Sequence, residues 1–280
     1  MRPRLRYFGG RALLNLSALV VIVCSVFPVY WMVNTSLLPA SAIMSQTPHW
    51  WPDQFTIGNY GAAVAGTGFY SALGTSLAVT TITLVAALLF AFLAAVALSR
   101  FRFRSKKTIV ITILAIQMIP AEAMIVSTFR VLDGWHLLNS IIGLSAVYIA
   151  VVLPFTIWTL RGFINGMPVE LEEAAMIDGC SRVGAFWRIT FPLLAPALVS
   201  TGIFAFIQAW NEFVFALVVM TRPDSQTLPI WLRSFVQATK ATDWAVVMAG
   251  STLMAIPVVV FFLLVQHRMT SGLVSGAVKG

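Results

Sequence analysis

The sequence predicts an all-α, polytopic membrane protein with six transmembrane helices and a helix–turn–helix in one cytoplasmic loop. Of its 280 residues, 59% are hydrophobic and only 10% are charged. Soluble domains carry about 25% charged residues, so a water-soluble fold would leave much of this apolar surface uncovered. The hydrophobic residues also gather in runs of about 20, long enough for a helix to cross the bilayer.

Six apolar runs are expected to be spans, and no repeat divides the chain, so residues 1–280 are predicted to form one transmembrane domain. Helices are expected because lipid offers no hydrogen-bond partner to the backbone. The first run is too long for a signal-peptide core and is expected to be retained. The runs cover approximately residues 12–33, 72–98, 108–128, 140–160, 193–219 and 246–266.

The distribution of Lys and Arg gives an orientation. Of the 18 basic residues, all but four lie on the side of the membrane that holds both termini. The positive-inside rule therefore predicts that both termini are cytoplasmic. The net charge of +8 sits in short segments between apolar runs, so no nucleic-acid partner is expected and the bilayer accounts for it. The four exceptions are Arg130, Arg222, Arg233 and Lys240.

Neither a metal site nor a nucleotide site is expected in this chain. Cys24 and Cys180 form no disulfide framework, and the three histidines have neither the mutual spacing nor the acidic partners of a metal site. No G-x-x-x-x-G-K-[ST] loop is present to hold nucleotide phosphates. No catalytic residue is assigned, because an intramembrane hydrolase would need a Ser–His, paired-Asp or zinc constellation within the spans.

The loop at residues 161–192 has the pattern of a helix, a glycine turn and a second helix. Pro168 suits a first helical position, and the glutamates that follow it favour the positive end of a helix. Gly179 can end this helix with a positive φ. A second short helix is expected from Val183 to Ile189, before Pro192 opens the next span.

This loop resembles the signature loop of permease subunits of ATP-binding-cassette (ABC) importers. The resemblance rests on Glu173-Ala174-Ala175, three residues before Gly179, nine more before Ile189, and Pro192. Elsewhere the chain resembles the carbohydrate-uptake, maltose-permease-like branch, and the similarity covers nearly the whole sequence. The segments concerned are Ala209-Trp210-Asn211-Glu212-Phe213 and the ending Ser271-Gly272-Leu273 through Val278-Lys279-Gly280.

The resemblance implies that the loop is a coupling helix docking into a cleft of a cytoplasmic ATPase. Glu173 would pair with a basic group there, the alanines would permit close approach, and Gly179 would allow the turn. The residues expected to couple the chain to the ATPase are Glu172, Glu173, Ala174, Ala175, Asp178, Gly179, Ile189 and Pro192.

The resemblance also implies the rest of the assembly, placed in a bacterial plasma (inner) membrane. The chain would form half of a sugar pathway, beside a second, related permease. Two ATPase subunits would carry ATP and Mg²⁺, while this chain would carry no cofactor. An extracytoplasmic binding protein would deliver the solute.

Polar residues inside the spans are candidates for the solute pathway or its gate. An ionised group such as Glu122 is costly in lipid, so it should face the bundle interior, and Pro120 should kink its helix. Interhelical hydrogen bonding is the alternative role for such residues. The candidates are Gln117, Glu122, Gln208, Asn211 and Glu212.

Two other functions remain open at this point. A secondary transporter or channel would use intramembrane carboxylates, and only Glu122 and Glu212 could serve. An ABC importer for a non-sugar solute, such as a glycerol phosphodiester, is the other.

Overall fold

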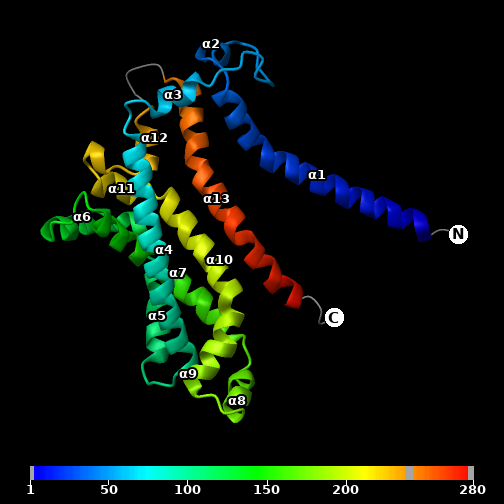
Figure 1. Ribbon diagram of the computed structural model, residues 1–280, viewed down its shortest axis with the longest axis vertical. Coiled ribbons are helices and arrows are strands. Elements are labelled where there is room, and N and C mark those ends of the chain that lie inside the picture. Colours follow the sequence, from blue (N-terminus) through cyan, green and yellow to red (C-terminus); the bar gives the residue numbers. More distant parts are fainter. Residues whose placement is uncertain (1–2, 237–241, 277–280) are drawn as a thin grey trace. The chain divides into compact units, whose positions relative to one another are not determined.

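The computed structural model describes residues 3–236 and 242–276 (Figure 1). Over these residues every regular element is helical, which confirms the predicted all-α class. Two compact units divide the chain: residues 1–67 with 232–256, and residues 68–231 with 257–280. Lys240 and the end of the resembling tail, Val278-Lys279-Gly280, lie outside the described residues.

The first unit contains α1 (Pro3–Ser36), α2 (Ala40–Ile43) and α3 (Gly58–Val64). Over Leu14–Ser36, α1 is long and apolar enough to cross a membrane. The side-chain nitrogen Nδ2 of Asn34 donates to the backbone carbonyl of His49 at 2.8 Å, which ties the end of α1 to the following loop. Asn59 donates to the carbonyls of Ser36 and Leu38, both at 2.8 Å, so α3 is fastened to the same end.

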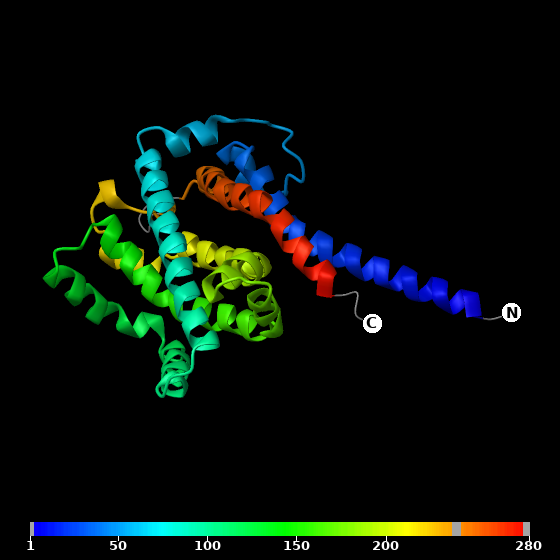
Figure 2. The same ribbon diagram turned by 60° about the horizontal axis from the view of Figure 1, so that its bottom comes forward.

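The core of the second unit is formed by α4 (Phe69–Arg100), α7 (Ile141–Asn165) and α10 (Phe191–Asn211) (Figure 1, Figure 2). Small residues allow these helices to approach closely: Ala87, Ala91 and Ala95 of α4 are fully buried. Thr75, Ser76 and Thr80 are also buried on α4, as expected of small packing residues. With 32 residues at about 1.5 Å each, α4 is long enough to cross the bilayer.

The run predicted at 108–128 is a broken helix in the structure. α5 (Lys106–Gln117) ends before Pro120, and η1 (Ala121–Met124) with α6 (Ile125–Gly134) follows at a bend of 90°. Proline has no N–H to donate and disfavours helical backbone in the residue before it, so a bend was expected. The bend is a complete interruption over residues 118–120 instead of a kink within one helix.

The helix predicted at 193–219 also ends early, at Asn211. Glu212 takes an extended conformation, and α11 (Val214–Val219) begins a separate helix. The chain continues through η3 (Pro223–Ser225), α12 (Leu228–Arg233) and α13 (Trp244–Gly276). Ser76 of α4 accepts a hydrogen bond from the backbone nitrogen of Leu228 at 2.8 Å, which holds the start of α12.

Five helices among the described residues are long and apolar enough to cross a membrane. The number rises to six when α5 with η1 and α6 is taken as one broken span. The five are Leu14–Ser36, Phe69–Arg100, Ile141–Asn165, Arg182–Asn211 and Trp244–Gln266.

Candidate coupling loop and pathway residues

The coupling loop (residues 161–192) forms the predicted helix, glycine turn and helix. α8 (Glu170–Ile177) begins two residues after Pro168, and Gly179 follows it with φ of 92°. L-residues with side chains rarely adopt this backbone conformation, so glycine suits the turn. α9 (Arg182–Ala185) is then capped by Ser181, whose hydroxyl accepts from the nitrogen of Gly184 at 3.1 Å.

α9 leads into α10 without an intervening loop. A single π turn, η2 (Phe186–Thr190), joins the two helices. Two rings of this turn pack on Phe92 of α4: Phe186, with ring centroids 5.8 Å apart, and Trp187, at 6.3 Å. The second half of the coupling loop, α9 with η2, is therefore fixed to the helical core.

Glu172 points into the permease. Its Oε1 accepts from Nε of Arg100 at 2.8 Å and from the hydroxyl of Thr190 at 2.7 Å. The side chains of Glu172 and Arg100 are only 12% and 14% exposed. Glu172 thus fastens α8 to the last residue of α4 and to η2, and its carboxylate is engaged within the permease.

Most of the other predicted coupling residues on or directly after α8 are exposed. Glu173, Ala174 and Asp178 are exposed, and the neighbouring Ile177 is 86% exposed. Ala175 and Ile189 are half-buried, Gly179 is exposed in the turn, and Pro192 is exposed in the first turn of α10. α8 therefore presents an acidic and apolar face on a rigid support.

The predicted pathway residues occupy two different segments. Gln117 ends α5 and Glu122 lies in η1, and both are exposed on this chain. Among the described residues, nothing donates a hydrogen bond to the carboxylate of Glu122. Gln208 and Asn211 are exposed near the end of α10, and Asn211 donates to the carbonyl of Ile207 at 3.0 Å.

Glu212 has a structural partner that the sequence did not reveal. Its carboxylate accepts from the backbone nitrogens of Phe215 at 2.8 Å and Ala216 at 3.1 Å. These nitrogens belong to the first turn of α11, whose donors lack partners within the helix. Glu212 therefore caps α11, whether or not it also contacts a solute.

Sequence reasoning missed Arg100 and Thr190 as partners of Glu172. Arg100 is separated from Glu172 by 72 residues, so no local spacing connects the two. Its position at the end of the second apolar run was the only available signal. Thr190 lay in the apolar stretch between Ile189 and Pro192, where a buried hydroxyl needs a local acceptor.

Comparison with known proteins agrees with this geometry. The chain is 42% identical over 275 residues to the diacetylchitobiose uptake system permease protein DasC of Streptomyces coelicolor, covering 98% of this chain and 99% of that one. It is 33% identical over 262 residues to the trehalose transport system permease protein SugB of Mycobacterium tuberculosis, covering 93% and 95%.

The fold is also found in a solved structure. It matches a crystal structure of a bacterial ABC transporter involved in the import of the acidic polysaccharide alginate, with a TM-score of 0.78 and 21% identity. The match covers 95% of this chain and 98% of that chain. Residues 87–271 match the family described as the binding-protein-dependent transport system inner membrane component. The chain belongs to this family and is a multi-pass permease subunit of an ABC importer.

Proposed function

We propose that this permease forms half of the pathway of a sugar importer and is moved by separate ATPase subunits through α8. The outward face of α8 carries the proposal, because Glu173, Ala174 and Asp178 are exposed while Glu172 anchors the same helix inward. A force applied to the exposed face would reach α4 and α10 through the hydrogen bonds of Glu172. A loose loop would absorb such a force.

The partners follow from this role. Two ATPase subunits would bind ATP and Mg²⁺, a second related permease would complete the pathway, and a binding protein would deliver the solute from outside. Both termini and the coupling loop would be cytoplasmic, following the positive-inside rule. Gln117, Glu122, Gln208, Asn211 and Glu212 are proposed to line the outer pathway or its gate.

A carbohydrate cargo is proposed because the names of several relatives specify sugars, including diacetylchitobiose, trehalose and maltose. A thermal-shift screen of the partner binding protein would identify the class. A ligand at 100 times its Kd stabilises by about 2.7 kcal/mol, so a cognate disaccharide raises the Tm measurably. A rise with glycerol phosphodiesters and none with sugars would contradict the sugar assignment.

The coupling role is tested by reversing one charge. Glu173→Arg is expected to abolish co-purification of the ATPase and ATP-driven uptake, because an exposed acidic contact becomes repulsive. Asp133→Arg on α6 is the matched control, since Asp133 is also exposed and lies outside the loop. Intact uptake in Glu173→Arg would remove the proposed coupling role.

A further inference from the structure

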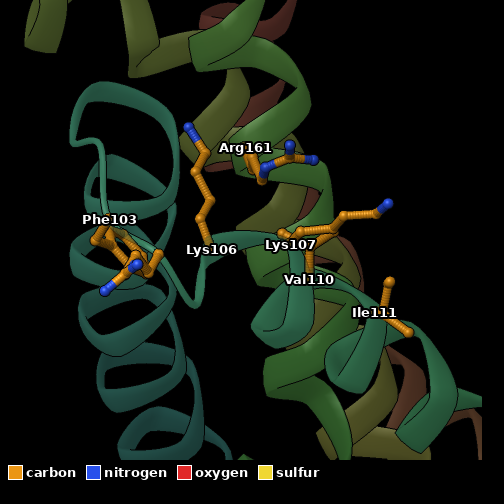
Figure 3. Close-up of a pocket in the computed structure, with 7 residues that line it drawn as sticks. Phe103, Lys106, Lys107, Val110, Ile111 and Arg161 are labelled. Carbon is orange, nitrogen blue, oxygen red and sulfur yellow. The ribbon is translucent and has the colours of Figure 1, made fainter.

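A basic hollow lies between the start of α5 and α7, apart from the coupling face of α8. It is open to the surface and has a volume of about 420 Å³. Figure 3 shows Lys106 and Lys107 at the start of α5 and Arg161 on α7 around the same space. The residues that line it are Phe103, Arg104, Lys106, Lys107, Val110, Ile111 and Arg161.

The positive charge of this hollow has no partner in the part of the chain that the structure describes. Four of the seven lining residues are cationic, none is acidic, and none of the four forms an ion pair with a described residue. Nε of Arg161 is buried and makes no hydrogen bond with those residues. Four cations without an acidic partner around one hollow favour an anionic ligand.

Arg100 and Arg161 each have one buried nitrogen without a described partner, Nη2 in Arg100 and Nε in Arg161, but the two differ at Nε. Arg100 also lies at the end of a spanning helix, but its Nε donates to Glu172. Arg161 instead lies over the ring of Trp158, with its guanidinium carbon 5.6 Å from the ring centroid. This contact orients the guanidinium, and no described residue accepts a hydrogen bond from its Nη nitrogens.

The lining also changes from charged to apolar along α5. Lys106 and Lys107 begin the helix, and Val110 and Ile111 follow one turn later, about 6 Å further along the axis. Ile111 is 55% exposed and Phe103 is 38% exposed, so both offer open apolar surface. A ligand that fills the hollow would meet both cations and open hydrocarbon.

We propose that this hollow binds an anionic phospholipid, with its phosphodiester headgroup on Arg161 and Lys106 and an acyl chain along Val110 and Ile111. Free phosphate would use the cations but not the apolar wall. The positive-inside rule explains why basic residues lie near this end of the spans. It does not explain why residues from two segments 55 positions apart converge on one hollow without acidic partners. The proposed function enters only in assigning the site to the cytoplasmic leaflet.

The test uses the complete importer, purified in a neutral detergent and titrated with phosphatidylglycerol, phosphatidylcholine or inorganic phosphate. Lipid bound to the complex is counted by native mass spectrometry. The variants are Arg161→Gln and Lys106→Gln, each expected to weaken phosphatidylglycerol binding about fivefold, the usual contribution of one basic residue near an anionic lipid. Arg102→Gln is the matched control, because Arg102 is exposed in the same loop and does not line the hollow.

The proposal expects phosphatidylglycerol to bind better than phosphatidylcholine, phosphate to compete weakly, and Arg102→Gln to bind as the wild type does. Equal weakening in all three variants would mean general charge attraction and would overturn the site. Equal binding of the two lipids would also overturn it. Full displacement by millimolar phosphate would assign the hollow to a free anion instead.

Two features keep the result decisive. Should Arg161→Gln fail to assemble, Lys106→Gln still decides, since Lys106 is only half-buried at the start of α5. The titration contains neither sugar nor ATP, so it measures lipid binding independently of transport. Its result therefore holds even if Glu173→Arg leaves uptake intact. Failure of the proposed function and failure of the lipid site are therefore separate outcomes.

Discussion

Nε of Arg100 lies 2.8 Å from Oε1 of Glu172, and this ion pair joins the last residue of α4 to the first turn of α8. Both side chains are largely buried, and Thr190 adds a second hydrogen bond to the same carboxylate oxygen. The two neighbouring glutamates thus differ in exposure, with Glu172 largely buried and Glu173 exposed. Glu172 holds the coupling helix to the permease, and we expect Glu173 to hold it to the ATPase.

The first prediction concerns this pair. Glu172→Ala leaves Arg100 without its charged acceptor. It is expected to lower the free energy of unfolding by about 2 kcal/mol, typical of a hydrogen bond to a charged group. A double-mutant cycle of Arg100→Ala and Glu172→Ala, measured by thermal unfolding in detergent, should give a coupling energy of about 1–3 kcal/mol. Additive effects would show that the pair contributes nothing to the attachment of α8.

The second prediction concerns Gly143 in α7. A β-carbon at this position would lie 2.2 Å from the backbone oxygen of Leu137, which cannot move aside as a flexible side chain can. Gly143→Ala is therefore expected to destabilise by about 1–3 kcal/mol, as overpacked sites do. Gly162→Ala in the same helix is the control, since nothing lies within 4 Å of its added β-carbon. Equal melting temperatures of the two variants would contradict the prediction.

The third prediction concerns Asn139, which joins the loop before α7 to the loop after α11. Its Oδ1 accepts from the nitrogen of Arg222 at 2.8 Å and the hydroxyl of Ser225 at 3.0 Å, and its φ is 55°. Asn139→Gly removes these bonds but tolerates the backbone, whereas Asn139→Ala adds about 1–2 kcal/mol of left-handed strain. The alanine variant should therefore melt below the glycine variant, and both below the wild type. The reverse order would exclude backbone strain at this position.

The fourth prediction separates transport from stability at Glu122. Because its side chain is exposed on this chain, Glu122→Gln should change the free energy of unfolding by less than about 0.5 kcal/mol. We expect its solute uptake to fall, since the carboxylate is proposed to line the pathway. Asp133→Asn, an exposed change on the adjoining α6, should keep uptake.

Glu212 completes that test. Glu212→Gln retains one acceptor oxygen for the first turn of α11, so a modest loss of thermal stability is expected. Normal uptake in both Glu122→Gln and Glu212→Gln would leave Glu212 as a helix cap only. It would also remove Glu122 from the pathway.

The elements set by local rules could be predicted from the sequence. The apolar runs gave the helical class, and the spacing from Pro168 to Pro192 gave the helix–turn–helix with Gly179 at positive φ. Two predicted spans are interrupted in the structure before their predicted ends, and the reason is the same in both. At Pro120 and at Glu212 the backbone leaves the helix within an apolar run, so hydropathy does not register the interruption.

The hydrogen-bond partners of polar side chains could not be predicted from the sequence, for a different reason. Glu172 and Glu173 are adjacent and chemically identical, and the way α8 packs on η2 decides which of them meets Arg100 and Thr190. The basic hollow has the same origin. Arg161 and Lys106 count simply as positive charges in the sequence, and the fold of α5 on α7 brings them together.

The π turn between α9 and α10 has a mechanical consequence. It contains one residue more than an α-helical turn would, and no slack loop separates the helices on either side. Passing that extra residue along the axis would rotate the two helices by about 100° and shift them by about 1.5 Å relative to each other. Such a shift would turn the face of α10 that carries Gln208 and Asn211 relative to α9.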